Sequence, residues 1–126
     1  MNAQDQPRHT RLLIVDDDEK FVRLLHDYLE PFGYQVDTAF DGRDGLAKAI
    51  DGNYAAIILD VTLPGASSRQ ILEEARRIRP DLRVVVTSAY SKETVDASFA
   101  GLPLLQFVRK PFMVSEIVRL LKEPPS

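Results

Sequence analysis

The chain has 126 residues, of which 44% are hydrophobic and 28% are charged, and this is enough for one compact domain with a buried core. A formal net charge of -3, with both signs interspersed, argues against direct binding to nucleic acid, which requires a basic surface. The absence of cysteine excludes disulfides and thiolate metal sites, and no apolar run approaches the roughly 20 residues that span a bilayer.

Residues 1–10 are polar and lack the basic and apolar regions of a signal peptide. We therefore expect a cytoplasmic protein that makes no membrane contact. We also expect residues 1–10 to form a disordered tail and residues 11–126 to form the single folded domain.

Short apolar runs rich in β-branched residues alternate with longer amphipathic segments. Nearly continuous apolar character is typical of strands that are covered on both faces of a sheet. Four runs have this character, at residues 11–15, 55–59, 83–87 and 104–108. Residues 34–40 form a fifth and more polar run, which predicts a strand nearer an edge.

Helical periodicity occupies the segments between and after these strands. The predicted helices span residues 21–32, 42–51, 68–79, 92–100 and 115–122. Gly33, the pair Gly52-Asn53 and Pro80 are the expected stop signals for the first three. Strict alternation of five strands with five helices predicts an α/β fold with a doubly wound, five-stranded parallel sheet.

Polar residues follow the predicted inner strands at the points where each strand ends. Asp16 and Asp17 follow the first strand, and Asp60 follows the third. Ser88 follows the fourth strand and Lys110 follows the fifth. Because the carboxyl ends of parallel strands lie at one edge of the sheet, where ligands bind in this class of fold, we expect these side chains to converge.

Three convergent carboxylates repel one another unless a cation lies among them or their pKa values rise. A set of oxygen ligands with no His or Cys suits a hard ion, and we expect Mg²⁺ at Asp16, Asp17 and Asp60. Asp18 is different, because an aspartate directly before a helix is more often the helix N-cap.

The motifs VDD (15–17), LDVTLPG (59–65), TSAY (87–90) and FVRKPF (107–112) resemble those of the response regulator receiver domain of two-component signalling. The likeness covers residues 11 to about 122 in order. It implies a flavodoxin-like fold in which an aspartate takes a phosphoryl group from a sensor histidine kinase or a histidine phosphotransfer protein, in a phosphorelay that requires Mg²⁺.

Carried over residue by residue, the resemblance makes Asp60 the phosphoacceptor and Asp16 and Asp17 the metal-binding pair. Thr62 would lend its backbone carbonyl to the ion. Lys110 would be the cation directed at the acceptor and then at the phosphoryl group. A carboxylate is a competent nucleophile toward phosphorus, so the chemistry agrees with this assignment.

The resemblance also assigns a switch. Ser88, followed by a small residue, would bond a phosphoryl oxygen, and Phe107 would be the aromatic that turns inward. The Lys110-Pro111 bond would be cis. The surface of the fourth helix, fifth strand and fifth helix would then change toward a downstream effector, and a phosphorylation-dependent dimer is a further expectation.

One stretch departs from the family pattern. After the turn at Pro64-Gly65 the family usually has a residue, an Asp and a Gly, whereas this chain has Ala66-Ser67-Ser68. Serine is also a good helix cap, so the change exchanges one helix start for another. It leaves the geometry of residues 64–68 open.

Two other functions remain open alongside the phosphoacceptor, which is not itself an enzyme but assists its own phosphorylation and dephosphorylation. A Mg²⁺-dependent aspartyl-phosphate phosphatase uses a similar set, but it needs a second acid two residues after the nucleophile, and position 62 is Thr. A receiver-like interaction module without phosphate turnover is the other. The cognate kinase, the output, and whether the chain acts alone or within a longer protein are not encoded in these motifs.

Overall fold

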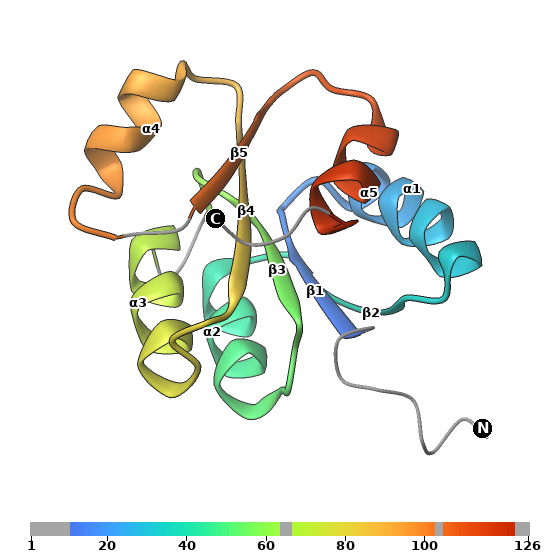
Figure 1. Cartoon of the computed structure of the whole chain (residues 1–126), viewed down its shortest axis with the longest axis horizontal. Coiled ribbons are helices and arrows are strands. Elements are labelled where there is room, and N and C mark those ends of the chain that lie inside the picture. The colour runs from blue at the N-terminus through green and yellow to red at the C-terminus, as the bar shows by residue number, and fades with distance from the viewer. Residues whose placement is uncertain (1–10, 64–66, 103–104, 123–126) are drawn as a thin grey trace.

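The computed structural model describes residues 11–63, 67–102 and 105–122. The tail predicted at residues 1–10 and the turn predicted at Pro64-Gly65 lie outside these ranges. Five strands form one parallel sheet in the order β2-β1-β3-β4-β5 (Figure 1). The strands are β1 (Arg11–Val15), β2 (Gln35–Ala39), β3 (Ala56–Asp60), β4 (Arg83–Ser88) and β5 (Leu105–Arg109).

Helices cover both faces of the sheet. They are α1 (Glu19–Leu29), α2 (Gly42–Asp51), α3 (Ser68–Ile78), α4 (Lys92–Ser98) and α5 (Val114–Lys122). Helices α1 and α5 lie on one side, and α2, α3 and α4 lie on the other (Figure 1). The predicted doubly wound α/β fold of five strands and five helices is therefore confirmed.

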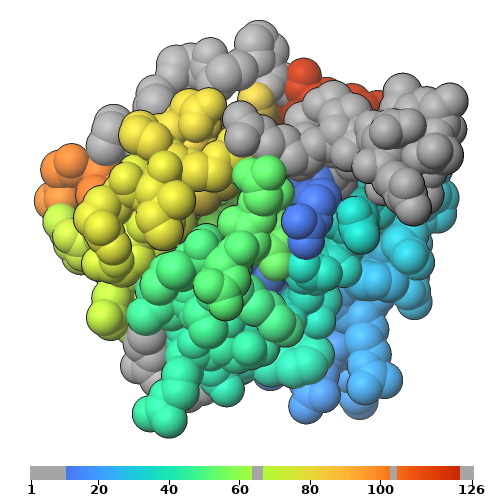
Figure 2. Space-filling model, turned by 90° about the horizontal axis from the view of Figure 1, so that it is seen from below, coloured from blue at the N-terminus to red at the C-terminus, as the bar shows by residue number. Residues whose placement is uncertain are grey.

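Strand β1 shows how side-chain alternation builds two cores. Leu13 and Val15 pack with α2, α3 and α4, whereas Leu12 and Ile14 pack with α1 and α5. All four are at most 1% exposed. In the view from below, a small dark blue patch of β1 is visible between green and teal atoms (Figure 2). Burial on both faces explains why its sequence is continuously apolar.

The two edge strands test the predictions differently. Strand β2 lies at one edge and most of its residues are partly exposed, as its polar sequence predicted. Strand β5 lies at the other edge, and its described apolar residues pack into the cores on both faces but are less buried than the apolar sequence predicted. Leu105, Gln106 and Phe107 are only half-buried, Val108 is buried, and Arg109 is exposed. An edge strand has a neighbour on one side only, which leaves its flank open to solvent.

Helix α1 begins earlier and ends earlier than predicted. Asp18 is its N-cap, and the Asp18 carboxylate accepts a hydrogen bond from the Phe21 N–H at 3.1 Å, as predicted for this residue. The α-helix ends at Leu29 and continues as the 3₁₀ turn η3 (Glu30–Phe32). Pro31 accounts for the change, because it has no N–H and its ring clashes with the preceding turn of an α-helix.

Among the described residues, no helix has the length and apolar character needed to cross a membrane.

Gly45 allows α2 to lie close against β1. A methyl group at this position would lie 2.6 Å and 3.2 Å from the two methyl carbons of Val15. Val15 is fully buried and β-branched, so it has little freedom to move away. Because Val15 directly precedes Asp16, this contact also helps to fix the position of Asp16 at the end of β1.

We expect Gly45→Ala to destabilise the fold by about 1–2 kcal/mol, since overpacking at Val15 outweighs the helix propensity that alanine adds. Chemical denaturation measures the change. Val15→Ala removes the obstructing methyl groups, so the double variant should be more stable than the sum of the two single changes predicts. Strict additivity would contradict the overpacking account.

Candidate functional site

Three carboxylates meet at the carboxyl end of the sheet. Asp16 directly follows β1, and Asp60 is the last residue of β3, the neighbouring strand. Together with Asp17 they place carboxylate oxygens within 4.8 Å of one another. Asp16 is 2% exposed and Asp60 is 8% exposed, whereas Asp17 is open to solvent. The sheet order thus brings Asp60 next to Asp16 and Asp17, which lie far from it in the sequence.

Lys110 extends into this cluster from the segment after β5. Its Nζ donates to Asp16 Oδ2 at 2.8 Å and lies 3.7 Å from Asp60 Oδ2. The Lys110 backbone N–H donates to the Ser88 carbonyl at 2.7 Å, which ties the loop to the end of β4. The peptide bond between Lys110 and Pro111 is cis, as predicted.

The closest partner of Lys110 differs from the expectation. The motif directed the ammonium group at Asp60, but in the structure its shortest contact is with Asp16. Asp16 is the more deeply buried acid, so its charge has the greater need for a partner. Burial opposes the charged form of Lys110, but the hydrogen bond and charge of Asp16, followed by the charge of Asp60, outweigh it and raise the pKa of the ammonium group.

The surroundings of Asp60 raise the pKa of its carboxyl group above that of an ordinary aspartate when no metal is bound. Burial, and after it the charge of Asp16, raises the pKa of Asp60 to about 6. Lys110 and a hydrogen bond from the Thr62 N–H act in the opposite direction but do not offset these effects. A cation placed among the acids would relieve the repulsion.

The remaining predicted residues lie around Asp60. The Thr62 N–H donates to Asp60 Oδ1 at 3.3 Å, and the proposed use of the Thr62 carbonyl as a metal ligand stays a prediction. Ser88 is the last residue of β4 and is 2% exposed. Its Oγ accepts a hydrogen bond from the Tyr90 N–H at 2.9 Å, which leaves the hydroxyl hydrogen available for another acceptor.

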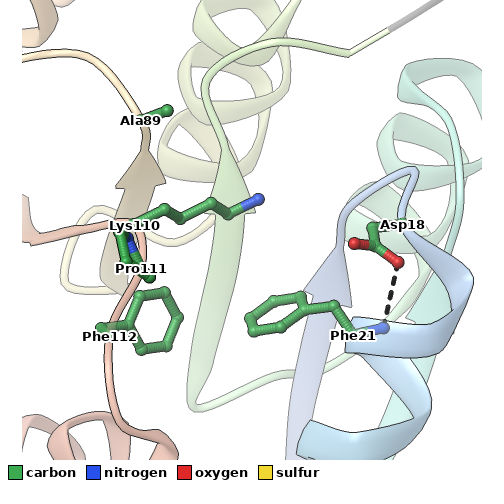
Figure 3. A pocket seen from close by; sticks show the side chains of 6 residues that line it. All are labelled: Asp18, Phe21, Ala89, Lys110, Pro111 and Phe112. Carbon is green, nitrogen blue, oxygen red and sulfur yellow. Dashed lines mark hydrogen bonds between the residues drawn. The ribbon is translucent and has the colours of Figure 1, made fainter.

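A pocket of about 320 Å³ adjoins Lys110. Figure 3 shows the Lys110 side chain extending past the rings of Phe21 and Phe112, which lie side by side and line the pocket. These rings pack edge to face with centroids 5.5 Å apart, and Lys110 Nζ lies 5.1 Å from the centre of the Phe21 ring. Sequence reasoning missed Phe21, because an aromatic residue at helical spacing reads as ordinary core.

Ser68 is the second residue whose place in the site was not foreseen. It is 4% exposed, and its hydroxyl donates to the backbone carbonyls of Asp60 and Val61. The sequence did signal that residues 66–68 depart from the family pattern. It did not signal that the serine side chain turns back onto the end of β3, since a serine at a helix start is also a common cap.

The acidic cluster fits a hard divalent cation. All its ligand atoms are carboxylate oxygens, and the ion that prefers such ligands while keeping several waters is Mg²⁺. A second group, His26, Asp27 and Glu30, lies on the exposed side of α1 and the turn that follows it. It lies on another part of the surface from Lys110 and β3 and takes no part in the site.

A model of the response regulator receiver domain matches residues 12–122. The chain therefore belongs to this family. It is 31% identical over 119 residues to the transcriptional regulatory protein ResD of Bacillus subtilis, and the match covers 94% of this chain and 49% of ResD. The chain spans about half the length of the curated relatives that it matches.

Solved structures of receiver proteins share the fold. A CheY-like receiver domain from Methanospirillum hungatei has a TM-score of 0.80 at 28% identity, with 90% of each chain covered. TrrA from Thermotoga maritima, solved with Mg²⁺ and a beryllium fluoride, has a TM-score of 0.72 at 32% identity and coverage of 89% and 98%. A Burkholderia pseudomallei response regulator with a phosphorylated aspartic acid and a calcium ion has a TM-score of 0.76 at 27% identity and coverage of 90% and 66%.

We expect Asp60→Asn to stabilise the metal-free protein at pH 7 by roughly 1–3 kcal/mol. A carboxyl group whose pKa is raised by folding leaves the native state stable at low pH and costs stability as the pH rises from about 4, its unfolded pKa, to about 6. The advantage of Asp60→Asn should therefore disappear as the pH falls from 6 to 4. Urea denaturation with a metal chelator present measures it.

Asp81→Asn is the matched control. Asp81 is exposed and lies just before the start of β4, whereas the cluster lies at the opposite, carboxyl end of the sheet. It should change stability little at either pH. A gain for Asp60→Asn that is the same at pH 4 and pH 7 would contradict the electrostatic account.

Proposed function

We propose that this chain accepts a phosphoryl group on Asp60, in a Mg²⁺-dependent reaction, from a sensor histidine kinase or a histidine phosphotransfer protein. The observation that carries the proposal is the convergence of Asp16, Asp17 and Asp60 with Lys110 in contact with two of them. The family match, the phosphorylated aspartic acid of the Burkholderia protein and the Mg²⁺ and beryllium fluoride of TrrA support it.

Asp60, Lys110 and Thr62 have different roles in the proposed phosphoryl transfer. Asp60 supplies the carboxylate oxygen that attacks phosphorus, while the bond from phosphorus to the donor nitrogen breaks and its electron pair returns to the imidazole. Lys110 lies within 3.7 Å of the carboxylate and can follow the negative charge as it moves onto the phosphoryl oxygens. Thr62 holds the other carboxylate oxygen through its N–H.

Asp16, Asp17 and Asp60, with the carbonyl of Thr62, are the groups that would hold Mg²⁺. Bound Mg²⁺ neutralises charge on the acids and on the phosphoryl oxygens. Asp16 is already oriented, because Asp16 Oδ1 accepts a hydrogen bond from the Asp18 N–H at 3.0 Å and Oδ2 accepts one from Lys110. A preset carboxylate loses little freedom when an ion binds.

Signal output would pass through Ser88 and Phe107. The buried Ser88 hydroxyl would gain a phosphoryl acceptor that exists only in the modified state, which is the differential contact that a population shift requires. Phe107 is half-buried against the core that contains Val95 and Phe99, next to α4. The α4–β5–α5 surface would then favour an effector or a second copy of the chain.

Incubation with Mg²⁺ and acetyl phosphate should add one phosphoryl group to the wild-type chain and none to Asp60→Asn, because only position 60 loses its nucleophile. Intact-mass measurement tests this. Asp81→Asn serves as the control and should be modified as readily as wild type. An equal mass gain in the wild type and in Asp60→Asn would overturn the assignment of Asp60.

Asp17→Ala should weaken Mg²⁺ binding at least tenfold, whereas Asp18→Ala should change it by less than threefold. Asp17 belongs to the acid cluster, but Asp18 caps α1. In the metal-free protein Asp17→Ala should be more stable than wild type, because it relieves repulsion among the acids. Asp18→Ala should be less stable than wild type, because it loses a helix cap worth about 1 kcal/mol. Titration calorimetry and denaturation measure the two effects, and equal Mg²⁺ affinities for the two variants would contradict this division of roles.

A further inference from the structure

Ser68 is the first residue of α3, yet its side chain contacts the end of β3 rather than its own helix. Its Oγ donates to the Asp60 carbonyl and lies 2.9 Å from the Val61 carbonyl. Ser67, one residue earlier, is the N-cap, and its hydroxyl accepts a hydrogen bond from the Gln70 N–H at 3.0 Å. The capping role predicted for serine is thus filled by Ser67, and Ser68 is left for another role.

A chain of contacts runs from Ser68 to the phosphoacceptor through one peptide group. The Val61 carbonyl and the Thr62 N–H belong to the same planar peptide, so fixing one end fixes the direction of the other. The carbonyl end accepts from Ser68 at 2.9 Å, and the N–H end donates to Asp60 Oδ1 at 3.3 Å. Hydrogen bonds at both ends of a peptide polarise it and strengthen each other.

Each oxygen of the Asp60 carboxylate has a different contact. Oδ1 accepts from the Thr62 N–H, and Oδ2 faces Lys110 at 3.7 Å. The long flexible side chain of Lys110 restrains Oδ2 weakly, so the peptide of residues 61 and 62 is the firmer restraint on the plane of the carboxylate. Attack on phosphorus requires that plane to be held in line with the donor.

We propose that Ser68 is a positioning residue for Asp60, whose hydroxyl holds the Val61–Thr62 peptide so that the Thr62 N–H stays directed at the acceptor carboxylate. This rests on the proposed function for its kinetic consequence but not for its structural one. Ser68 is 4% exposed, so bulk solvent competes little for its hydroxyl hydrogen. Its one hydrogen is shared between two carbonyls, an arrangement that restrains both peptides that follow Asp60.

The test uses the full chain and two variants that lack the hydroxyl, Ser68→Ala and Ser68→Gly. At saturating Mg²⁺ and acetyl phosphate, both should take up the phosphoryl group about three- to tenfold more slowly than wild type, the factor expected for one lost hydrogen bond. In the metal-free protein, the Thr62 amide resonance should move upfield and its hydrogen exchange should accelerate in both variants.

Ser67→Ala is the matched control, because it removes the neighbouring hydroxyl and destabilises the same helix start without touching residues 60–62. It should leave the Thr62 amide and the phosphorylation rate unchanged. If Ser68→Ala and Ser68→Gly match Ser67→Ala in both measurements, Ser68 is only a structural residue and the proposal fails. A wild-type chain that takes up no phosphoryl group overturns the proposed function instead, and the Thr62 amide then decides the role of Ser68.

Discussion

The ion contacts between Lys110, Asp16 and Asp60 are the constraint on which the rest of the site depends. Two of the three clustered carboxylates are buried, and buried like charges cost stability unless a cation compensates them. Lys110 provides part of that compensation, but the pKa of Asp60 is still raised to about 6. The cluster is therefore under electrostatic stress without a metal, and this stress favours the binding of a divalent cation.

The fold brings the charged and polar groups of the site together at one edge of the sheet. The order β2-β1-β3-β4-β5 sets the ends of β1 and β3 side by side, and the segments after β4 and β5 add Ser88 and Lys110 at the same edge. Close packing behind the edge holds it rigid, with Gly45 allowing α2 to approach Val15. A rigid edge keeps charged groups in the arrangement that phosphoryl transfer requires, and preorganisation of this kind is the largest contribution proteins make to such reactions.

The sequence was sufficient for the strands, the doubly wound fold and the convergence of acids, because these follow from hydrophobic periodicity and from the common direction of parallel strands. It was insufficient where the outcome depends on side-chain direction. The preference of Lys110 for Asp16, the half-exposed flank of β5, and the turn of Ser68 toward Val61 depend on tertiary neighbours that periodicity does not specify. Ser68 shows the limit most clearly, because Ser67 and Ser68 are identical residues in adjacent positions, and only their surroundings make one a helix cap and the other a contact with the end of β3.

A crystal structure of this chain with Mg²⁺ and beryllium fluoride tests the central claim most directly. The account predicts the beryllium bonded to one carboxylate oxygen of Asp60, Mg²⁺ bound by Asp16, Asp17, the other Asp60 oxygen and the Thr62 carbonyl, and Lys110 in contact with a fluoride. Beryllium fluoride on a different carboxylate, or Mg²⁺ bound away from Asp16 and Asp17, would contradict it.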